Sequence, residues 1–420
     1  MSEWRNVTLA EISDRVDYGY TASASDDPAL PRFLRITDIA QTHLDWSGVP
    51  GCPIDGKNLS KYELATDDIV VARTGATVGY AKRIRTHPEA VFASYLVRFR
   101  LAPEAAPSFV GAVVESSDYK RWVQQNAGGA AQPNASAKVL GAFPLRLPGK
   151  ETQVKIGAIF DTIADLIENN RRRVEVLEEM VRAIYREWFV KFHYPGHQDV
   201  PLVDSAHGPV PDGWTPSTCG VELNFIGGGT PAKGESSYWE GGTVPWYTPT
   251  DLTKTGWRYA AGSALGITDL GVAKSSARRF PAGSVMMTSR ATLGVLAIAT
   301  AEATTNQGFI VILPDERWSP GFIYEWLDAR ASDLAALGTG ATFKEITKGS
   351  FKSFPFVVPA QAVLDAYRVT TDPIEQQVRA LEQQTRNLSV LRDLLLPKLV
   401  TGKIDVSSLD LGALVERQVA

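Results

Sequence analysis

The sequence predicts an α+β protein in which two similar globular domains alternate with two long helices that pair as an antiparallel coiled coil. Three observations predict this fold class. An apolar seam with heptad spacing runs from Ile156 to Trp188, and a second seam in the same register runs from Ile374 to Leu399. Short β-like runs separated by Gly, Pro and Asp precede each seam in the same order.

The composition is that of a water-soluble globular protein. The 420 residues suffice for two or three domains with a core each, and the hydrophobic content of 44% and the charged content of 21% are ordinary. The formal charge of −4 argues against a protein that coats nucleic acid by bulk attraction. Any contact with nucleic acid must then come from local basic loops or be shared with a partner.

We expect a cytoplasmic protein that makes no membrane contact. The N-terminus has no basic segment followed by an apolar run, and no uninterrupted apolar stretch of about 18 residues occurs. The two cysteines, Cys52 and Cys219, have no metal-ligand spacing, which fits a reduced compartment.

Residues 1–147 form the first predicted globule. A helix is expected from Ser108 to Gln125, and a loop with neither helical nor strand periodicity follows at 128–138. The β-like runs of this globule are rich in branched and aromatic residues and lie at 33–40, 67–75 and 91–101.

Residues 148–194 form the first long helix. Its apolar positions alternate in steps of four and three residues, and Asn170 is the only polar residue on the seam. About 40 residues at about 1.5 Å per residue span roughly 60 Å, which is too long for a helix inside one globule. A helix of this kind needs a partner for its apolar stripe.

Residues 195–213 form a linker that is rich in proline and glycine. His193, His197 and His207 raise the possibility of a metal site. We favour turns and linker, because this segment lacks the helical geometry that would hold three ligands together.

The second globule, residues 214–358, repeats the first. A helix is expected at 322–337, and Ala291 and Thr292 match Ala76 and Thr77 within a shared A-T-x-G turn. The corresponding segments are 245–253 with 31–40, 284–300 with 68–84, and 338–359 with 128–148.

Residues 359–405 form the second long helix, and residues 406–420 form a C-terminal tail. Pro359 corresponds to Pro148, and the two seams then align without a gap. A duplicated unit that packs on its own copy gives a pseudo-two-fold pair, so we expect the helices to be antiparallel. The residues expected to pair them are Ile163, Ile167, Leu177, Ile184, Ile374, Val378, Leu388 and Leu395.

Catalytic signatures are absent from the sequence. It contains no GxxxxGK[ST] loop, no GxSxG elbow, no HExxH pair and no GxGxxG between a strand and a helix. Pro314 and Asp315 with their charged neighbours could be stretched into a nuclease motif, but a solvated loop is favoured. We therefore expect no catalytic residue, no metal ligand and no cofactor in this chain.

Both globules carry polar, glycine-flanked loops at matching places. Arginine can bond guanine in a bidentate manner, glutamine and asparagine can bond adenine, and lysine and backbone N–H groups suit phosphates. The structural alternatives are strand-turn chemistry repeated by duplication, and a salt bridge from Arg73 to Asp67 or Asp68. The candidate DNA-binding residues are Arg73, Thr74, Thr77, Gln132, Asn134, Lys138, Ser289, Arg290, Thr292, Thr342, Lys344 and Lys348.

Three segments carry a resemblance to a known family: LEEMVRAIYREWFVKFHYPG (177–196), LRDLLLPKLVTGKID (391–405) and GGAAQPNAS (128–136). Together with the order of globules and helices, they resemble the specificity (S) subunit of type I restriction-modification systems. In the second globule, Thr342, Phe343 and Lys344 stand where Gln132, Pro133 and Asn134 stand in the first.

The resemblance implies two target recognition domains, each of which reads one half of a bipartite site in double-stranded DNA, with the paired helices as a ruler. It also implies that modification (M) subunits, which carry S-adenosylmethionine chemistry, dock on the helices, and that a restriction (R) subunit joins them. The chain itself would be a non-catalytic specificity and scaffold subunit. Two alternatives stay open, namely a coiled-coil adaptor whose globules bind proteins and an enzyme such as a nuclease with a hidden site.

Overall fold

The computed structural model describes residues 4–40, 43–129, 133–339, 344–406 and 409–410. It divides the chain into two compact units. The first holds the residues up to Asn169 and from Thr385 onward, and the second holds Asn170–Gln384. The long helices α6 (Lys150–Tyr185) and α13 (Gln361–Val400) contribute to both units, so each unit is one globule with a part of both helices.

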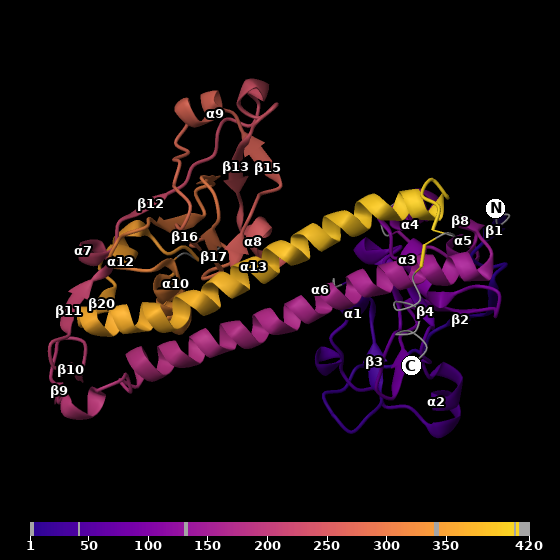
Figure 1. Cartoon of the computed structure of the whole chain (residues 1–420), viewed down its shortest axis with the longest axis horizontal. Helices are drawn as coiled ribbons and strands as arrows, with labels where there is room; N and C mark the ends of the chain where they lie inside the picture. Colours follow the sequence, from indigo (N-terminus) through magenta and orange to yellow (C-terminus); the bar gives the residue numbers. More distant parts are fainter. Residues whose placement is uncertain (1–3, 41–42, 130–132, 340–343, 407–408, 411–420) are drawn as a thin grey trace. The chain divides into compact units, whose positions relative to one another are not determined.

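The globule of the first unit is built on an antiparallel sheet with the strand order β2-β7-β4-β5 (Figure 1). Successive side chains of β4 point to opposite faces of the sheet, and every residue of this strand is buried. Ile69 and Val71 pack with α3 to α6 on one face, whereas Val70 and Ala72 pack on the other face. A strand covered on both sides explains the uninterrupted apolar run that the sequence shows here.

The strands of the first unit are β1 (Arg5–Thr8), β2 (Ser13–Tyr18), β3 (Arg32–Leu34), β4 (Ile69–Ala72), β5 (Ala81–Arg83), β6 (Ala90–Phe92), β7 (Leu96–Leu101) and β8 (Pro144–Leu147). Its helices, besides its parts of α6 and α13, are α1 (Ile36–Ile39), α2 (Gly56–Tyr62), α3 (Pro107–Val114), α4 (Ser117–Asn126) and α5 (Ala137–Gly141), with 3-10 turns η1 (Trp46–Gly48) and η2 (Gly75–Thr77). Strand β1 pairs antiparallel with β8, and β3 pairs parallel with β6.

The globule of the second unit repeats this plan in the sheet β12-β19-β16-β17-β14. Strand β16 lies between β17 and β19, as β4 lies between β5 and β7. Its residues alternate in the same way, because Val285 and Met287 face the core that contains α10 and the long helices, while Met286 faces the other core. The repeat of sheet order and side-chain direction confirms the predicted duplication.

The strands of the second unit are β9 (Leu202–Val203), β10 (Val210–Pro211), β11 (Thr215–Thr218), β12 (Phe225–Gly227), β13 (Val244–Tyr247), β14 (Tyr259–Ala260), β15 (Leu265–Ile267), β16 (Val285–Thr288), β17 (Leu296–Ala299), β18 (Thr304–Thr305), β19 (Phe309–Ile312) and β20 (Pro355–Val358). Its shorter helices are η3 (Arg186–Val190), η4 (His197–Asp199), α7 (Cys219–Glu222), η5 (Ser236–Tyr238), α8 (Pro249–Thr255), α9 (Asp269–Ala273), α10 (Pro320–Ala329), α11 (Ala331–Ala336) and α12 (Lys348–Lys352). The smaller sheets are β15-β13-β18, β11-β20 and β10-β9.

The two long helices pack antiparallel, as predicted. In the second unit, Asn170 of α6 donates through Nδ2 to Gln384 Oε1 at 3.1 Å, and further along α6 the ring of Tyr185 lies 6.3 Å from that of Tyr367. Later residues of α6 therefore contact earlier residues of α13, as in an antiparallel pair. In the first unit the start of α6 shares a core with Leu395 and Leu399 near the end of α13.

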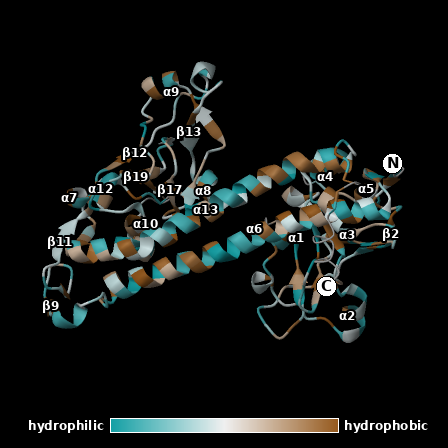
Figure 2. Ribbon diagram, viewed as in Figure 1, coloured by the Kyte–Doolittle hydropathy of each residue, from teal (hydrophilic) through white to brown (hydrophobic). Residues whose placement is uncertain are grey.

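Apolar and polar residues alternate along both helices, as their ribbons show in Figure 2. Helix α6 gives way at Arg186 to a π-helical turn that ends at Val190, before the predicted limit at 194. Helix α13 ends at Val400, and Gly402 beyond it has the positive φ of 72° that favours glycine at a helix end.

Two predicted helices are each divided in the structure. The segment expected to be one helix from Ser108 to Gln125 forms α3 and α4, because Ser116 adopts extended backbone and its hydroxyl caps the new helix at Tyr119 N. The segment 322–337 likewise forms α10 and α11, which meet at Arg330.

Candidate nucleic-acid interface

The first candidate site lies where β4 ends. Arg73 follows this buried strand, and its guanidinium donates to Asn134 Oδ1 at 3.2 Å and lies over the ring of Tyr18, 4.9 Å from the centroid. The hydroxyl of Tyr18 in turn accepts from Ala137 N at 3.0 Å. The arginine is thus held in place at the surface by groups from two other segments.

The neighbouring candidates lie on the same loops or on the short helices that follow them. Thr74 pairs with Asn134 in an isolated antiparallel bridge, and Thr77 donates to the Thr74 carbonyl at 3.3 Å. Lys138 is exposed on α5, whose N-cap is Ser136. The structure therefore brings Arg73, Thr74 and Asn134 together, whereas Gln132 lies outside the described residues.

The second candidate site lies at the equivalent end of β16. Arg290 lies beside Glu345, with Nε 3.5 Å from Oε2, and the two residues pair in an isolated antiparallel bridge. Thr292, Lys344 and Lys348 are exposed. Thr342 lies outside the described residues.

Ser289 requires a correction. Its side chain is buried, and its backbone donates to Gly308 O and accepts from Ile346 N. A serine side chain at this position is too short to leave the strand end, so we remove Ser289 from the set of surface candidates.

The register of the two sites also differs from the sequence prediction. Ala135 N donates to Arg73 O at 2.8 Å, and Ile346 N donates to Ser289 O at 2.9 Å. Arg73 therefore corresponds to Ser289. It follows from the next position on each chain that Thr74 corresponds to Arg290 and Asn134 to Glu345.

A turn of unequal length explains this shift of one residue. Gly75 and Ala291 occupy the same place with φ of 72° and 63°, and the next positive-φ glycines are Gly79 and Gly294. The turn is one residue shorter in the second globule. Aligning the A-T-x-G letters therefore shifts the residues before the turn by one position and matches Arg73 with Arg290 instead of Ser289. Glu345 was missed for a separate reason: the sequence comparison set residue 338 against residue 128, and so Lys344 against Asn134, whereas in the structure Thr339 occupies the place of Gly128.

The alternative that Arg73 forms a salt bridge with Asp67 or Asp68 is wrong, whereas Arg290 does lie beside a carboxylate. Asp68 is bonded by Arg100, and Asp67 lies near Arg83, so neither carboxylate binds Arg73. Arg290 does have an acidic partner, but this partner is Glu345.

The residues predicted to pair the helices are all buried or half-buried. Ile163 and Val378 are buried, and Asn170 is buried on the same seam. Leu177 and Ile184 pack on the core of the second unit, and Leu395 packs on that of the first. The half-buried members are Ile167, Leu177, Ile184, Ile374, Leu388 and Leu395.

Comparison with known proteins identifies the family. The family model described as the type I restriction modification DNA specificity domain matches residues 1–179 and again residues 211–378. The chain belongs to this family. It is a specificity subunit, and subunits of this kind are non-catalytic.

Named relatives agree with this assignment. The type I restriction enzyme MjaIX specificity subunit of Methanocaldococcus jannaschii is 32% identical over 175 residues, which are 41% of this chain and only 39% of that protein. The HindI specificity subunit of Haemophilus influenzae is 21% identical over 96% of this chain and 100% of its own length. The crystal structure of the S subunit from M. genitalium has the same fold, with a TM-score of 0.56 and 15% identity over 95% of this chain and 96% of that chain.

Family membership favours the specificity subunit over the adaptor and over the enzyme with a hidden site.

Within the described residues, no group of three or more histidine, cysteine or acidic side chains is arranged to hold a metal ion. No described helix is long and apolar enough to cross a membrane.

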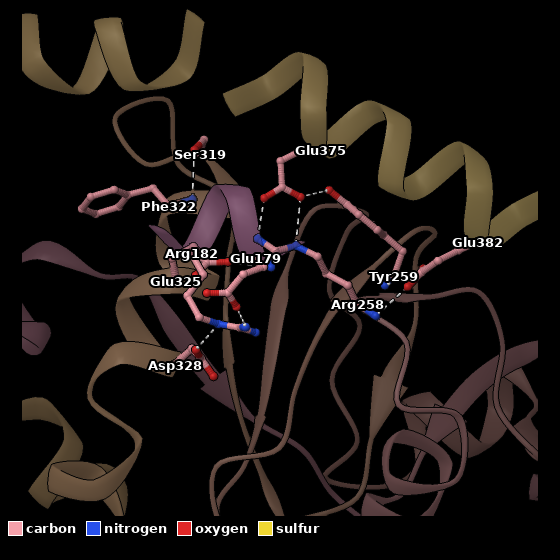
Figure 3. Close-up of polar contacts among 10 residues, drawn as sticks. All are labelled: Glu179, Arg182, Arg258, Tyr259, Ser319, Phe322, Glu325, Asp328, Glu375 and Glu382. Carbon is pink, nitrogen blue, oxygen red and sulfur yellow. Dashed lines mark hydrogen bonds and ion pairs between the residues drawn. The ribbon is translucent and has the colours of Figure 1, made fainter. Parts of the chain in front are cut away.

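The second recognition domain of this specificity subunit is fixed to α13 by a buried arginine (Figure 3). Arg258 donates to Glu375 Oε2 at 2.9 Å and to Glu325 Oε1 at 2.7 Å. Glu382 of α13 accepts from the backbone N–H groups of Arg258 and Tyr259 at 2.8 and 3.0 Å. Two carboxylates of one helix thus hold the edge of the sheet through charge-assisted hydrogen bonds.

This cluster contains more acid than base. Burial raises the pKa of the Glu325 and Glu178 carboxyls, and the nearby Arg258 opposes that shift. Burial disfavours the charge of Arg258, but Glu375 and Glu325 hold its pKa well above the usual value. The arginine therefore stays charged, and the carboxylates depend on it for compensation.

The first recognition domain is fixed to α6 by the same kind of contact. Arg83 contacts Asp161 at 2.7 Å and Arg85 contacts Asp165 at 2.6 Å. His43 Nδ1 lies 2.6 Å from Glu168 Oε2. Each recognition domain thus has its strand-end loops on a sheet that is anchored to a long helix.

Proposed function

We propose that this specificity subunit reads a bipartite site in double-stranded DNA, one half with each recognition domain. The observation that carries the proposal is the repeat of one two-part site in both domains. In each, an arginine at the end of the central strand lies against a polar side chain of a later loop, the one before α5 or α12. Both sites stand on buried strands, which hold such groups more firmly than loops alone would.

The chemistry of these groups suits base edges and phosphates. Guanidinium groups and amides can bond bases in a bidentate manner in the major groove. Phosphates suit the exposed lysines Lys138, Lys344 and Lys348. Phosphates or thymine methyl groups suit Thr74 and Thr292. We propose these residues as the contact set, together with Arg73, Asn134, Arg290 and Glu345.

We further propose that the helix pair sets the separation of the half-sites and carries methyltransferase (M) subunits, with a restriction (R) subunit joining them. A rigid spacer between two readers would fix half-site spacing by geometry. S-adenosylmethionine would then be bound by the M subunit. The net charge of −4 supports this division, since the partner would supply part of the phosphate contacts.

A gel-shift experiment with the complex of this chain and its methyltransferase subunits tests the proposal. We expect the complex to select one bipartite sequence from a pool of random duplexes. Binding without selection, or selection by the methyltransferase subunits alone, would contradict it.

A further inference from the structure

Glu345 occupies the place that Asn134 occupies in the first recognition domain. Asn134 exchanges backbone hydrogen bonds with Gly128 at 3.0 and 2.8 Å, and Glu345 exchanges the same two bonds with Thr339 at 3.1 and 2.9 Å. The backbones of the two sites are therefore equivalent at this position. What differs is the side chain, which is an amide in one domain and a carboxylate in the other.

The side chain beside the arginine gives the two sites different net charges. Asn134 is neutral, so its site with Arg73 has a net charge of +1. Glu345 cancels the charge of Arg290, and both side chains remain accessible, at 41% and 48% of their full exposure. A carboxylate on a DNA-facing surface repels phosphates, so Glu345 weakens general attraction to DNA. Its presence there is favourable if it accepts a hydrogen bond from a base.

The hydrogen-bonding groups that each base presents in the major groove limit which base can donate to the Glu345 carboxylate. Cytosine presents its N4 amino group with no adjacent acceptor, whereas adenine presents its N6 amino group beside the N7 lone pair. A carboxylate has only acceptors, so N7 of adenine would repel it. An asparagine amide has a donor for N7 and an acceptor for N6, and so it matches adenine.

We propose that Glu345 selects a cytosine in the half-site read by the second recognition domain. Arg290, at 3.5 Å from Glu345, then faces the O6 and N7 acceptors of a guanine. At the equivalent position of the other half-site, Asn134 selects an adenine. This inference rests on the proposed function and names the bases that it reads.

The test compares the methylation sites of the complete methyltransferase complex made with the unmodified chain, with Glu345→Gln and with Glu302→Gln. Glu302 is an exposed residue of the same domain that pairs with Arg279, so Glu302→Gln changes the net charge equally outside the candidate site. Methylated positions are sequenced on a random duplex library, and binding to duplexes with each base at the assigned position is then measured. The second half-site is the one that changes when residues 214–358 are exchanged for those of a relative.

We expect the unmodified complex to require a cytosine at one position of the second half-site. Glu345→Gln should shift that position from cytosine to adenine, a change in preference of roughly 5- to 150-fold. The other half-site should stay the same, and Glu302→Gln should keep the original sequence.

Three outcomes would overturn the inference. They are a second half-site without any G·C pair, an unchanged preference in Glu345→Gln, and equal weakening on all duplexes. Failure of the proposed function looks different, because the unmodified complex would then show no bipartite preference at all.

Discussion

Arg73 and Arg290 bring the same group to the surface from backbone positions that differ by one residue. Arg73 is held by Asn134 and by the ring of Tyr18, so it would lose little side-chain freedom on the proposed contact with DNA. A preorganised guanidinium of this kind gives more of its interaction energy to binding.

We expect Arg73→Ala to weaken binding of the complex to its cognate duplex by about 1–3 kcal/mol if the guanidinium contacts a base edge. If it contacts a phosphate instead, the affinity should fall equally for all DNA sequences, and the slope of log K against the logarithm of the salt concentration should decrease by about one unit. Titrations on cognate and scrambled duplexes at several salt concentrations separate the two. Arg121→Ala is the control, because Arg121 is exposed in the same domain and forms an exposed ion pair with Asp118; equal behaviour of the two variants would make Arg73 structural.

The buried cluster around Arg258 leads to a prediction about stability and pH. Arg258→Met leaves Glu325 and Glu375 without their cation, so the free energy of unfolding should fall by roughly 3–5 kcal/mol. Burial raises the pKa of Glu325 in the folded protein, so the stability that its protonation contributes is present at low pH and is lost as the pH rises through the raised pKa. Arg258 opposes this shift, so its removal raises the pKa of Glu325 further and the variant loses more stability as the pH rises.

The deficit of Arg258→Met should therefore be smaller near about pH 5 than near about pH 7.5. Urea titrations at both pH values measure it. Arg279→Met, which removes an arginine from surface pairs with Asp269 and Glu302, should cost no more than about 1 kcal/mol. A deficit for Arg258→Met that is the same at both pH values would show that the carboxylates do not depend on this cation.

Residue-scale detail was the part that the sequence predicted least well. Glu375 and Glu382 lie on a helix with many charged positions, and nothing in the heptad pattern separates these two buried carboxylates from solvated ones. Their burial depends on Arg258, which lies far away in the sequence. Glu345 was missed because its equivalence to Asn134 depends on which loop residues pair with them, Gly128 in one domain and Thr339 in the other, and letter matching does not reveal this pairing.

At the scale of elements, periodicity predicted more. The steps of four and three residues predicted both long helices and their pairing, because an apolar stripe on a long helix must be covered. The antiparallel direction was predicted from the duplication. The divisions of the shorter helices at Ser116 and Arg330 were not foreseen, since a cap inside a helical pattern is a local conformational choice.

Val378 and Val369 provide a matched test of the helix pair. Val378 is fully buried on α13, whereas Val369 on the same helix is 78% exposed. Val378→Ala should lower the free energy of unfolding by about 1.5–3 kcal/mol, the value of burying such a side chain. Val369→Ala should cost nothing, because alanine is the better helix former. Denaturant titrations of both variants decide the point, and similar losses for the two would contradict the predicted packing.

At the scale of the whole molecule, we propose that one chain holds two separable readers. Each unit has its own sheet, its own strand-end site and its own anchor to a long helix. The duplication was visible in the sequence, since both copies preserve the order of their strands.

The most direct measurement is the methylated sequence produced by the complete complex when residues 1–147 are replaced by the corresponding domain of a relative. We expect one half of the bipartite site to change, while the other half and the spacing between the halves stay the same, because residues 214–358 and both long helices are untouched. If both halves changed together, or if neither changed, the two domains would not be separable readers.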